Sequence, residues 1–347
     1  MVPRTMRAVL LKGHGGLEQL EYRSDVAVPE PRSGEVLLRI AAAGLNNTDL
    51  NLRTGWYAKI ATGTPGADAG WTGNAVTFPR IQGADACGTI VAVGADVDSS
   101  RVGERVIVNP VLRAPGTPLA EARYFGSDCN GAFADYATAP AGNALRITSS
   151  LSDAELAAVP CSYAAAENLL TRAGVTAGER VLVTGASGGV GCAAVQLAHH
   201  RGARVTALTQ PSKAEFIRAL GAAMVLARDA DLHQALGPES MDVIIDVVGG
   251  SQFGTLLEIL RHGGRYAVAG AIGGARVSLD LRTLYLKDLR LLGCTLFEPE
   301  IFAQLVGYLE RAELKPVVSA TYALRDLAAA QTAFATKTHV GKIVLIP

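Results

Sequence analysis

Small residues are concentrated in residues 181–198, VLVTGASGGVGCAAVQLA. The first residues are apolar and branched, as in a buried strand, and those after Gly191 are apolar and compatible with a helix. Between them, Ala186-x-Gly188-x-x-Gly191 matches the dinucleotide-binding pattern with alanine in place of its first glycine. The middle glycine of this pattern lets backbone N–H groups approach a pyrophosphate, and the last lets the helix pack on the strand. The segment predicts a dinucleotide site, although a tight turn without a ligand would need similar residues.

The elements around this turn alternate between strand and helix. Ser152 is a candidate helix cap, with Glu155 placed to complete a capping box. Beyond it, near-continuous apolar segments at 180–185, 204–209, 223–227, 242–248 and 265–271 are separated by helical stretches such as 192–202 and 213–221. This alternation predicts a doubly wound α/β domain, in which helices cover both faces of a parallel sheet.

The sequence before residue 150 has a different pattern, typical of short β-strands. Short segments rich in valine and leucine, at 34–42, 88–97 and 103–110, are closed by glycine, proline or aspartate, as in a β domain of hairpins and tight turns. Residues 340–347 again have this strand pattern. We therefore predict two domains, one formed by 1–149 and 318–347 and the other by 150–317.

Composition and charge restrict the partners. Of the 347 residues, 49% are hydrophobic, and 32 basic residues balance 32 acidic ones, so neither nucleic acid nor an anionic membrane is an expected partner. No apolar run is long enough for a membrane helix, and the amino terminus lacks a signal-peptide pattern. The five cysteines stand singly, without a Cys-x-x-Cys pair. We expect a cytoplasmic protein with reduced thiols and a small-molecule substrate.

The residues after the second strand of the predicted α/β domain indicate the cofactor. An NAD site places an acid there to bind the ribose 2′-hydroxyl, and that acid repels a 2′-phosphate. Here no acid follows Thr209 before Glu215, whereas Ser212 and Lys213 offer a hydroxyl and an ammonium. The alternative is that Ser212 caps a helix and Lys213 is a solvated surface residue. We predict NADP(H).

The chain as a whole resembles the medium-chain dehydrogenase/reductase family. The resemblance rests on the order of GEVLLRIAAAGLNNTDLNLRTG, GADACGTIVAVGADV, VGERVIV, GAFADYATAP, the nucleotide fold and GKIVL. The sequences GLN (44–46) and ASGGVG (186–191) are most similar to the zinc-free quinone-oxidoreductase branch. The resemblance implies an α/β fold with a GroES-like β-barrel catalytic domain and a doubly wound Rossmann domain. It also implies a homodimer, for which the apolar edge strand at 289–296 is our candidate interface.

Two expected metal ligands are missing. Zinc members of the family hold the catalytic metal with a Cys and a His where this chain has Asn46 and Ala84, and with a further residue that Cys161 matches. Asp85 and Cys161 together fall short of the three protein ligands of a catalytic zinc. The region that matches the structural zinc lobe keeps only Cys129. We predict that no residue of the chain is a metal ligand.

Without a Lewis acid, alcohol oxidation lacks the group that polarises the oxygen, and reduction of a quinone or an α,β-unsaturated carbonyl is favoured. The resemblance implies that Tyr57 donates its phenol proton to the acceptor. It also implies that the Thr48 hydroxyl is a proton relay and that Asn46 contacts the nicotinamide ribose. Their alternatives are an interface aromatic, a turn-capping hydroxyl and an Asx turn. The expected cofactor contacts are Asn46, Ser187, Gly188, Gly189, Val190, Thr209, Ser212, Lys213, Val248, Gly270 and Ile272.

The segment 56–77 is longer than the resemblance implies and contains both tryptophans, Trp56 and Trp71. It is either a lid over the substrate or a packed insertion.

Two functional alternatives remain open. One is alcohol oxidation with a metal recruited by Asp85 and Cys161, and the other is a non-catalytic NADPH-binding protein.

Overall fold

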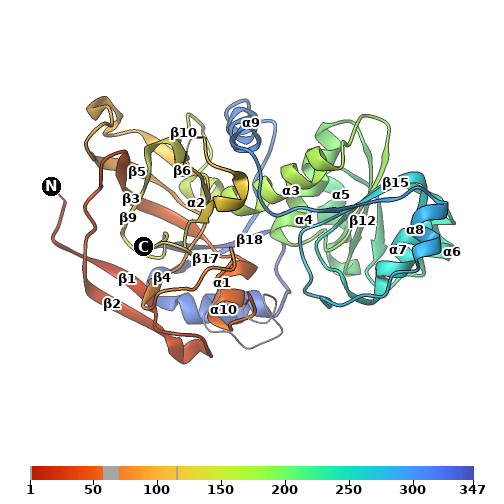
Figure 1. The fold of residues 1–347 in the computed structure, drawn as a ribbon, viewed down its shortest axis with the longest axis horizontal. Helices are drawn as coiled ribbons and strands as arrows, with labels where there is room; N and C mark the ends of the chain where they lie inside the picture. The colour runs from red at the N-terminus through yellow and green to blue at the C-terminus, as the bar shows by residue number, and fades with distance from the viewer. Residues whose placement is uncertain (1, 58–69, 115) are drawn as a thin grey trace. The chain divides into compact units, whose positions relative to one another are not determined.

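The computed structural model describes residues 2–57, 70–114 and 116–347 (Figure 1). Its contacts divide the chain into two compact units, Met1–Cys161 with Glu298–Pro347, and Ser162–Phe297. These are called the first and second unit below. The domain boundaries at 149/150 and 317/318 stay a prediction. No helix in the described part of the chain is long and apolar enough to span a membrane.

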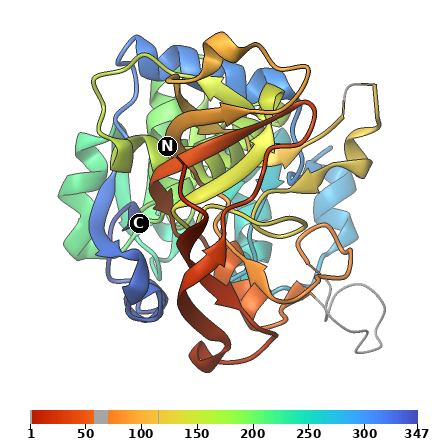
Figure 2. The ribbon, with the colours of Figure 1, turned by 90° about the vertical axis from the view of Figure 1, so that its left-hand side faces the viewer.

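The first unit is built mainly from β-strands, as predicted, and Figure 2 shows it from the side of β1 and β2. A three-stranded sheet has the order β2-β1-β4, a seven-stranded sheet the order β10-β6-β5-β3-β18-β17 with β9 also on β3, and β7 pairs with β8. The strands are β1 (Thr5–Leu11), β2 (Leu20–Ala27), β3 (Glu35–Gly44), β4 (Arg80–Ile81), β5 (Cys87–Val93), β6 (Arg105–Val108), β7 (Val111–Leu112), β8 (Arg123–Tyr124), β9 (Tyr136–Pro140), β10 (Ala144–Arg146), β17 (Val318–Ala323) and β18 (Lys342–Ile346). The helices are α1 (Asn47–Arg53), α2 (Asp153–Ala157), α9 (Pro299–Glu310) and α10 (Leu327–Ala335).

The carboxyl-terminal strand completes this unit. β18 is antiparallel to the end of β3, with Val344 opposite Gly44, and parallel to β17. Apolar side chains of β3, β5, β6 and β18, among them Leu38, Ile90 and Leu345, form one buried core with Phe125 and Phe133. The Ser152 cap of α2 is confirmed, since its Oγ accepts from the N–H of Glu155.

The second unit contains a six-stranded parallel sheet, as the alternation predicted. The strand order is β13-β12-β11-β14-β15-β16. The first strand in the chain, β11, is therefore central, and later strands add to one side of it and then to the other. The strands are β11 (Arg180–Val183), β12 (Arg204–Thr209), β13 (Ala222–Ala227), β14 (Met241–Asp246), β15 (Leu260–Val268) and β16 (Arg290–Gly293). The helices are α3 (Pro160–Arg172), α4 (Gly189–His200), α5 (Ala214–Ala219), α6 (Leu232–Leu236), α7 (Phe253–Ile259) and α8 (Leu281–Leu286). In such sheets a ligand binds beyond the carboxyl ends of the strands where the order reverses, here between β11 and β14.

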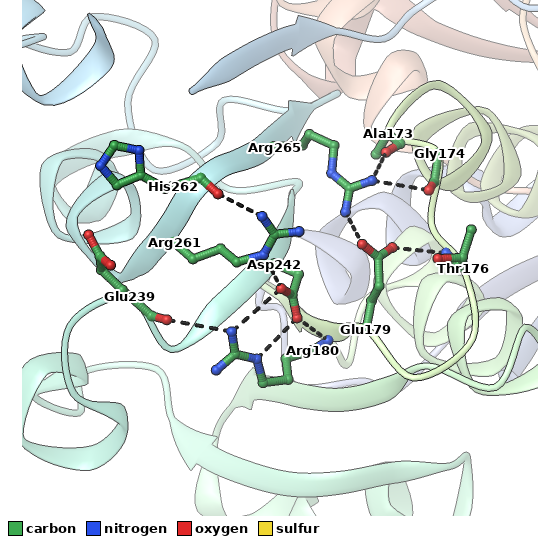
Figure 3. Close-up of polar contacts among 10 residues, drawn as sticks. All are labelled: Ala173, Gly174, Thr176, Glu179, Arg180, Glu239, Asp242, Arg261, His262 and Arg265. Atoms are coloured by element: carbon green, nitrogen blue, oxygen red, sulfur yellow. Dashed lines mark hydrogen bonds and ion pairs between the residues drawn. The ribbon is translucent and has the colours of Figure 1, made fainter. Parts of the chain in front are cut away.

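An arginine–carboxylate network ties the opposite, amino ends of the strands together (Figure 3). Asp242 of β14 accepts from Arg180 of β11, with Nε 3.0 Å from Oδ2, and from Arg261 of β15. Beside it Arg265 of β15 pairs with Glu179. Each carboxylate thus joins elements that are distant in sequence, and the network holds three neighbouring strands in place.

Candidate functional site

The turn between β11 and α4 lies at the predicted switch point. Gly188 is the amino-terminal cap of α4, and its backbone is extended. A Cβ on Gly191 would lie 2.2 Å from the carbonyl oxygen of Gly185, so only glycine allows this approach of helix to strand. The strand-to-helix turn therefore has the close packing that the glycine spacing predicts.

The predicted cofactor residues of the second unit gather at one end of its sheet. Ser187 to Val190 lie in the β11–α4 turn or begin α4, Thr209 ends β12, and Ser212 and Lys213 follow in a 3₁₀ turn. Val248, Gly270 and Ile272 lie just beyond the carboxyl ends of β14 and β15. The topology thus brings these residues to the edge where a dinucleotide would bind. Their individual contacts stay predictions.

This edge carries a buried cation and an unsatisfied hydroxyl. Lys213 is only 7% exposed, its Nζ lies 3.5 Å from Ser187 Oγ, and burial lowers its pKa. Arg228, which follows β13, adds positive charge and lowers that pKa further. Thr209 Oγ1 is buried and has no hydrogen-bond partner in the described part of the chain. Sequence reasoning missed Arg228, although it is the first basic residue after the predicted strand 223–227.

A buried polar cluster forms in the first unit around Asp85. Lys342 Nζ lies 2.7 Å from Asp85 Oδ2 and 2.5 Å from Asn46 Oδ1, and Asn46 Nδ2 donates to the same Asp85 oxygen at 3.0 Å. The remaining Asp85 oxygen accepts from the N–H of Cys161 at 2.6 Å. Asp85 has no exposed surface and Lys342 almost none. Burying these charges is tolerated because each is paired and hydrogen-bonded.

Local folding explains how the cluster assembles. Asn46 follows β3 and caps α1, and its backbone N–H donates to Asp49 Oδ2 at 2.8 Å. Lys342 begins β18, the strand that pairs with the end of β3. Burial raises the pKa of Asp49 to about 7, against the lowering effect of the Asn46 N–H. The Asn46 side chain is thus already bonded to Asp85 and Lys342 within the first unit. The predicted contact with the ribose would therefore use the second lone pair of Asn46 Oδ1.

Tyr124, which sequence reasoning did not single out, lies beside this cluster. Its ring stacks on Trp71 with centroids 4.0 Å apart, and its hydroxyl donates to Cys161 Sγ at 3.2 Å. Burial raises the pKa of Tyr124 well above its ordinary value and that of Cys161 to about 12, so both groups stay protonated near neutral pH. In the sequence, the segment containing Tyr124 is informative only for the cysteines it lacks.

Comparison with known proteins gives matches along almost all of the chain. Residues 32–149 match the family model of the alcohol dehydrogenase GroES-like domain, and residues 189–311 that of the zinc-binding dehydrogenases. A quinone oxidoreductase of Lama guanicoe is 30% identical over 99% of this chain and 98% of its own length. An acryloyl-coenzyme A reductase of Metallosphaera sedula is 31% identical over 98% of this chain and 99% of its own. The chain belongs to the medium-chain dehydrogenase/reductase family.

Solved structures agree with this assignment. A crystal structure of a provisionally named alcohol dehydrogenase from Sinorhizobium meliloti has a TM-score of 0.94 and 46% identity, covering 100% of this chain and 98% of that one. Within the family the chain falls in the quinone-oxidoreductase-like branch. The predicted fold is confirmed, and the protein is an NAD(P)H-dependent oxidoreductase.

Against this family background, the two other predicted catalytic residues lie near Tyr124. Thr48 and Tyr124 line one small cleft, and Thr48 Oγ1 is buried without a partner in the described residues. Burial raises the pKa of Tyr57, and Cys161 lies close enough to raise it further. The cleft is lined by Thr48, Asp49, Leu52, Trp71, Ala84, Tyr124, Phe125, Gly126 and Ser127. The structure thus brings Thr48 and Tyr124 to one cleft, with Asn46 engaged by the Asp85 cluster.

The tryptophans of the segment 56–77 both make ring contacts. Trp56 meets Tyr57 edge to face at 5.4 Å, and Trp71 stacks on Tyr124. Residues 58–69 lie outside the described part of the chain, and the choice between a lid and a packed insertion concerns them. Trp71 itself forms a wall of the cleft.

The residues at the family's metal position do not fit a metal ion. Asn46 and Ala84 replace two ligands, and the Asp85 carboxylate already faces the Lys342 ammonium. The Cys161 sulfur accepts a hydrogen bond from the Tyr124 hydroxyl at 3.2 Å. Among the described residues, no three His, Cys, Asp or Glu side chains gather as a metal-binding group.

Proposed function

We propose that this protein uses NADPH to reduce a quinone or an α,β-unsaturated carbonyl compound without zinc. The observation that carries the proposal is the set of side chains where zinc members of the family have metal ligands. Asn46 and Ala84 stand in place of two ligands, and Asp85 and Asn46 are both bonded to the buried Lys342. The names of relatives, quinone oxidoreductase and acryloyl-coenzyme A reductase, support this substrate class.

The second unit provides residues that fit a 2′-phosphate. β12 ends at Thr209 and no carboxylate follows it before Glu215, while Lys213 and Arg228 concentrate positive charge. The unsatisfied Thr209 hydroxyl is a further group that a ligand would pair. Ser187, Ser212 and Lys213 would hold the phosphate, and the helix that begins at Gly189 would hold the pyrophosphate. NADPH, when bound, supplies the hydride.

The first unit provides the groups that respond to the charge developing on the acceptor. When hydride adds to the β-carbon of an enone, or to a quinone, negative charge builds on the carbonyl oxygen. Hydroxyl donors such as Thr48 and Tyr57 stabilise that charge, and they do so more strongly where apolar walls exclude water. Leu52, Ala84 and Phe125 are such walls of the cleft that Thr48 lines.

One experiment separates the proposal from its alternatives. The purified protein is assayed with NADPH and NADH against a panel of quinones, enones and alcohols, and its metal content is measured. We expect NADPH-dependent turnover of quinones or enones, no stoichiometric zinc, and activity that survives a chelator. Alcohol oxidation that is lost together with one bound metal per chain would establish the alcohol dehydrogenase alternative. NADPH binding without turnover of any acceptor would establish the non-catalytic one.

We also propose a homodimer formed through the β16 edge of the second unit. Leu281, Tyr285 and Leu286 of α8 are each more than 60% exposed, and Leu291 on the edge strand itself is 37% exposed. Exposed apolar side chains beside an unpaired strand edge favour a second copy as the partner. A dimer by light scattering that Leu286→Lys with Leu291→Lys converts to a monomer would support this, and a wild-type monomer at micromolar concentration would contradict it. A cytoplasmic location remains our expectation.

A further inference from the structure

Tyr124 has a hydroxyl that the proposed function leaves unused. The hydroxyl contacts Cys161 Sγ, and Asp85 and Tyr57 lie close enough to influence its pKa. Tyr124 is 4% exposed and still lines the cleft that holds the unpartnered Thr48 Oγ1. Tyr124 and Thr48 therefore line one small cleft together with the apolar Leu52, Ala84 and Phe125, and neither comes from the nucleotide-binding sheet.

The phenol is held firmly. Trp71 stacks on one face of its ring, and the Trp71 backbone N–H donates to Ser127 Oγ at 3.1 Å. The Tyr124 N–H donates to Asp128 Oδ2 at 2.6 Å. A Cβ on Gly126, whose φ is +78°, would lie 2.7 Å from the backbone of Gly83. This close glycine contact fixes the loop of Tyr124 against the loop that carries Ala84 and Asp85, so the donor is preorganised.

The present partner of the hydroxyl is a poor one. A thiol sulfur is a weak hydrogen-bond acceptor, and Cys161 remains a thiol at neutral pH. An O–H that turns from such a sulfur to a carbonyl oxygen gains a stronger bond, and it gains more as that oxygen becomes negatively charged. Stabilisation that grows toward the transition state accelerates the reaction.

We propose that Tyr124 is a catalytic hydrogen-bond donor to the oxygen of the acceptor, and that Cys161 is the ground-state partner from which the acceptor displaces it. The inference rests on the proposed function and adds Tyr124 to the roles predicted for Tyr57 and Thr48. The hydride of NADPH forms the new C–H bond, the π electrons move onto the carbonyl oxygen, and Tyr124 bonds that oxygen while keeping its own proton. Water supplies the proton that completes the product.

The test is the turnover of an enone and a quinone by Tyr124→Phe. We expect its turnover number to fall by about ten- to a thousandfold, as for other single oxyanion donors. NADPH affinity, measured by fluorescence, should stay within about twofold of the wild-type value. A matched control is Tyr163→Phe, which removes another buried phenol, one that accepts from Gln196 Nε2 in the second unit. The control should keep its turnover.

Variants at Cys161 test the displacement directly. Serine is a stronger acceptor than a thiol and should hold Tyr124 more tightly, so Cys161→Ser should raise KM for the acceptor. Cys161→Ala removes the competing partner and should lower KM or leave it unchanged. If the wild type is active and Tyr124→Phe has the same turnover number, the assignment of Tyr124 is wrong. If KM for the acceptor is lower in Cys161→Ser than in Cys161→Ala, the acceptor does not displace Cys161 from Tyr124. A wild type that reduces no acceptor overturns the proposed function, and this inference with it.

Discussion

Lys342 holds its ammonium nitrogen 2.7 Å from Oδ2 of Asp85, and neither side chain has more than 3% of its surface exposed. Asn46 bonds both members of the pair, donating to the carboxylate and accepting from the ammonium. The pair and its amide therefore form one electrostatic unit. This unit links the end of β3, the loop before β5 and the beginning of β18, and the same loop carries Ala84, which lines the proposed cleft.

Removal of the ammonium should destabilise the first unit. Lys342→Met leaves the Asp85 charge buried without its partner, and breaking such a pair typically costs about 3–5 kcal/mol. Denaturant unfolding measures the loss. The double variant Lys342→Met with Asp85→Asn should recover part of it, since no buried charge then remains. A single variant as stable as the wild type would show that Asp85 does not depend on Lys342.

Tyr57→Phe should lower turnover of a carbonyl acceptor by about ten- to a thousandfold, if its hydroxyl stabilises charge only in the transition state. Steady-state kinetics with an enone measure the effect, and NADPH binding should barely change. Tyr22→Phe on β2, where the side chain is 39% exposed, is the control for loss of a phenol. An unchanged turnover number would leave Tyr57 as a wall of the pocket.

Lys213→Ala should weaken NADPH binding by about ten- to a hundredfold, because hydrogen bonds to charged groups contribute roughly 1.5–3 kcal/mol. NADH binding should stay the same, and the NADPH penalty should shrink as salt rises. We expect Arg228→Ala to have a smaller effect of the same kind. Arg218→Ala, on the exposed side of α5, is the control. Equal loss of both nucleotides in Lys213→Ala, or a wild type that prefers NADH, would refute the assignment.

Stability should depend on pH through Asp242. Burial acts to raise its pKa, but bonds from Arg180 and Arg261 outweigh this and hold the pKa at about 2, below the usual 3.8. The contribution is therefore fully present above about pH 4 and is lost as the pH falls toward 2, with a size of about 2 kcal/mol. Asp242→Asn should show that loss near neutral pH, and the gap to wild type should close below pH 4. A gap of constant size would exclude this linkage.

The sequence was sufficient for the second unit because its strands are continuous apolar runs between helices. The segments 180–185 and 204–209 became β11 and β12, and the glycine spacing located the turn after β11. The two-residue strands β4, β7 and β8 have no period to detect, so the setting of Tyr124 could not be predicted. The sequence around Lys342 indicates only a strand, since nothing local reveals that a lysine will meet a buried aspartate.

The burial of the Lys213 side chain could not be predicted from the local sequence either. The sequence offered a solvated, first-turn Lys213 as one alternative, and the structure buries this side chain to 7% exposure. Its neighbours Pro211 and Ser212 are exposed, so the difference arises from how the turn after β12 packs on the β11–α4 turn, a contact between separate parts of the chain. The segment 58–69 lies outside the described residues, and its role in substrate choice stays a prediction.

The pairing of β18 with β3 also determines when the Asp85 cluster becomes complete during synthesis. Asn46 and Lys342 are separated by 296 positions, and the whole second unit is translated between them. Until residues 342–346 leave the ribosome, β3 lacks one neighbour, and Asp85 lacks its cation. A nascent chain therefore exposes an open strand edge and an unpaired carboxylate throughout translation of the nucleotide-binding sheet, which is a period when chaperones would act on it.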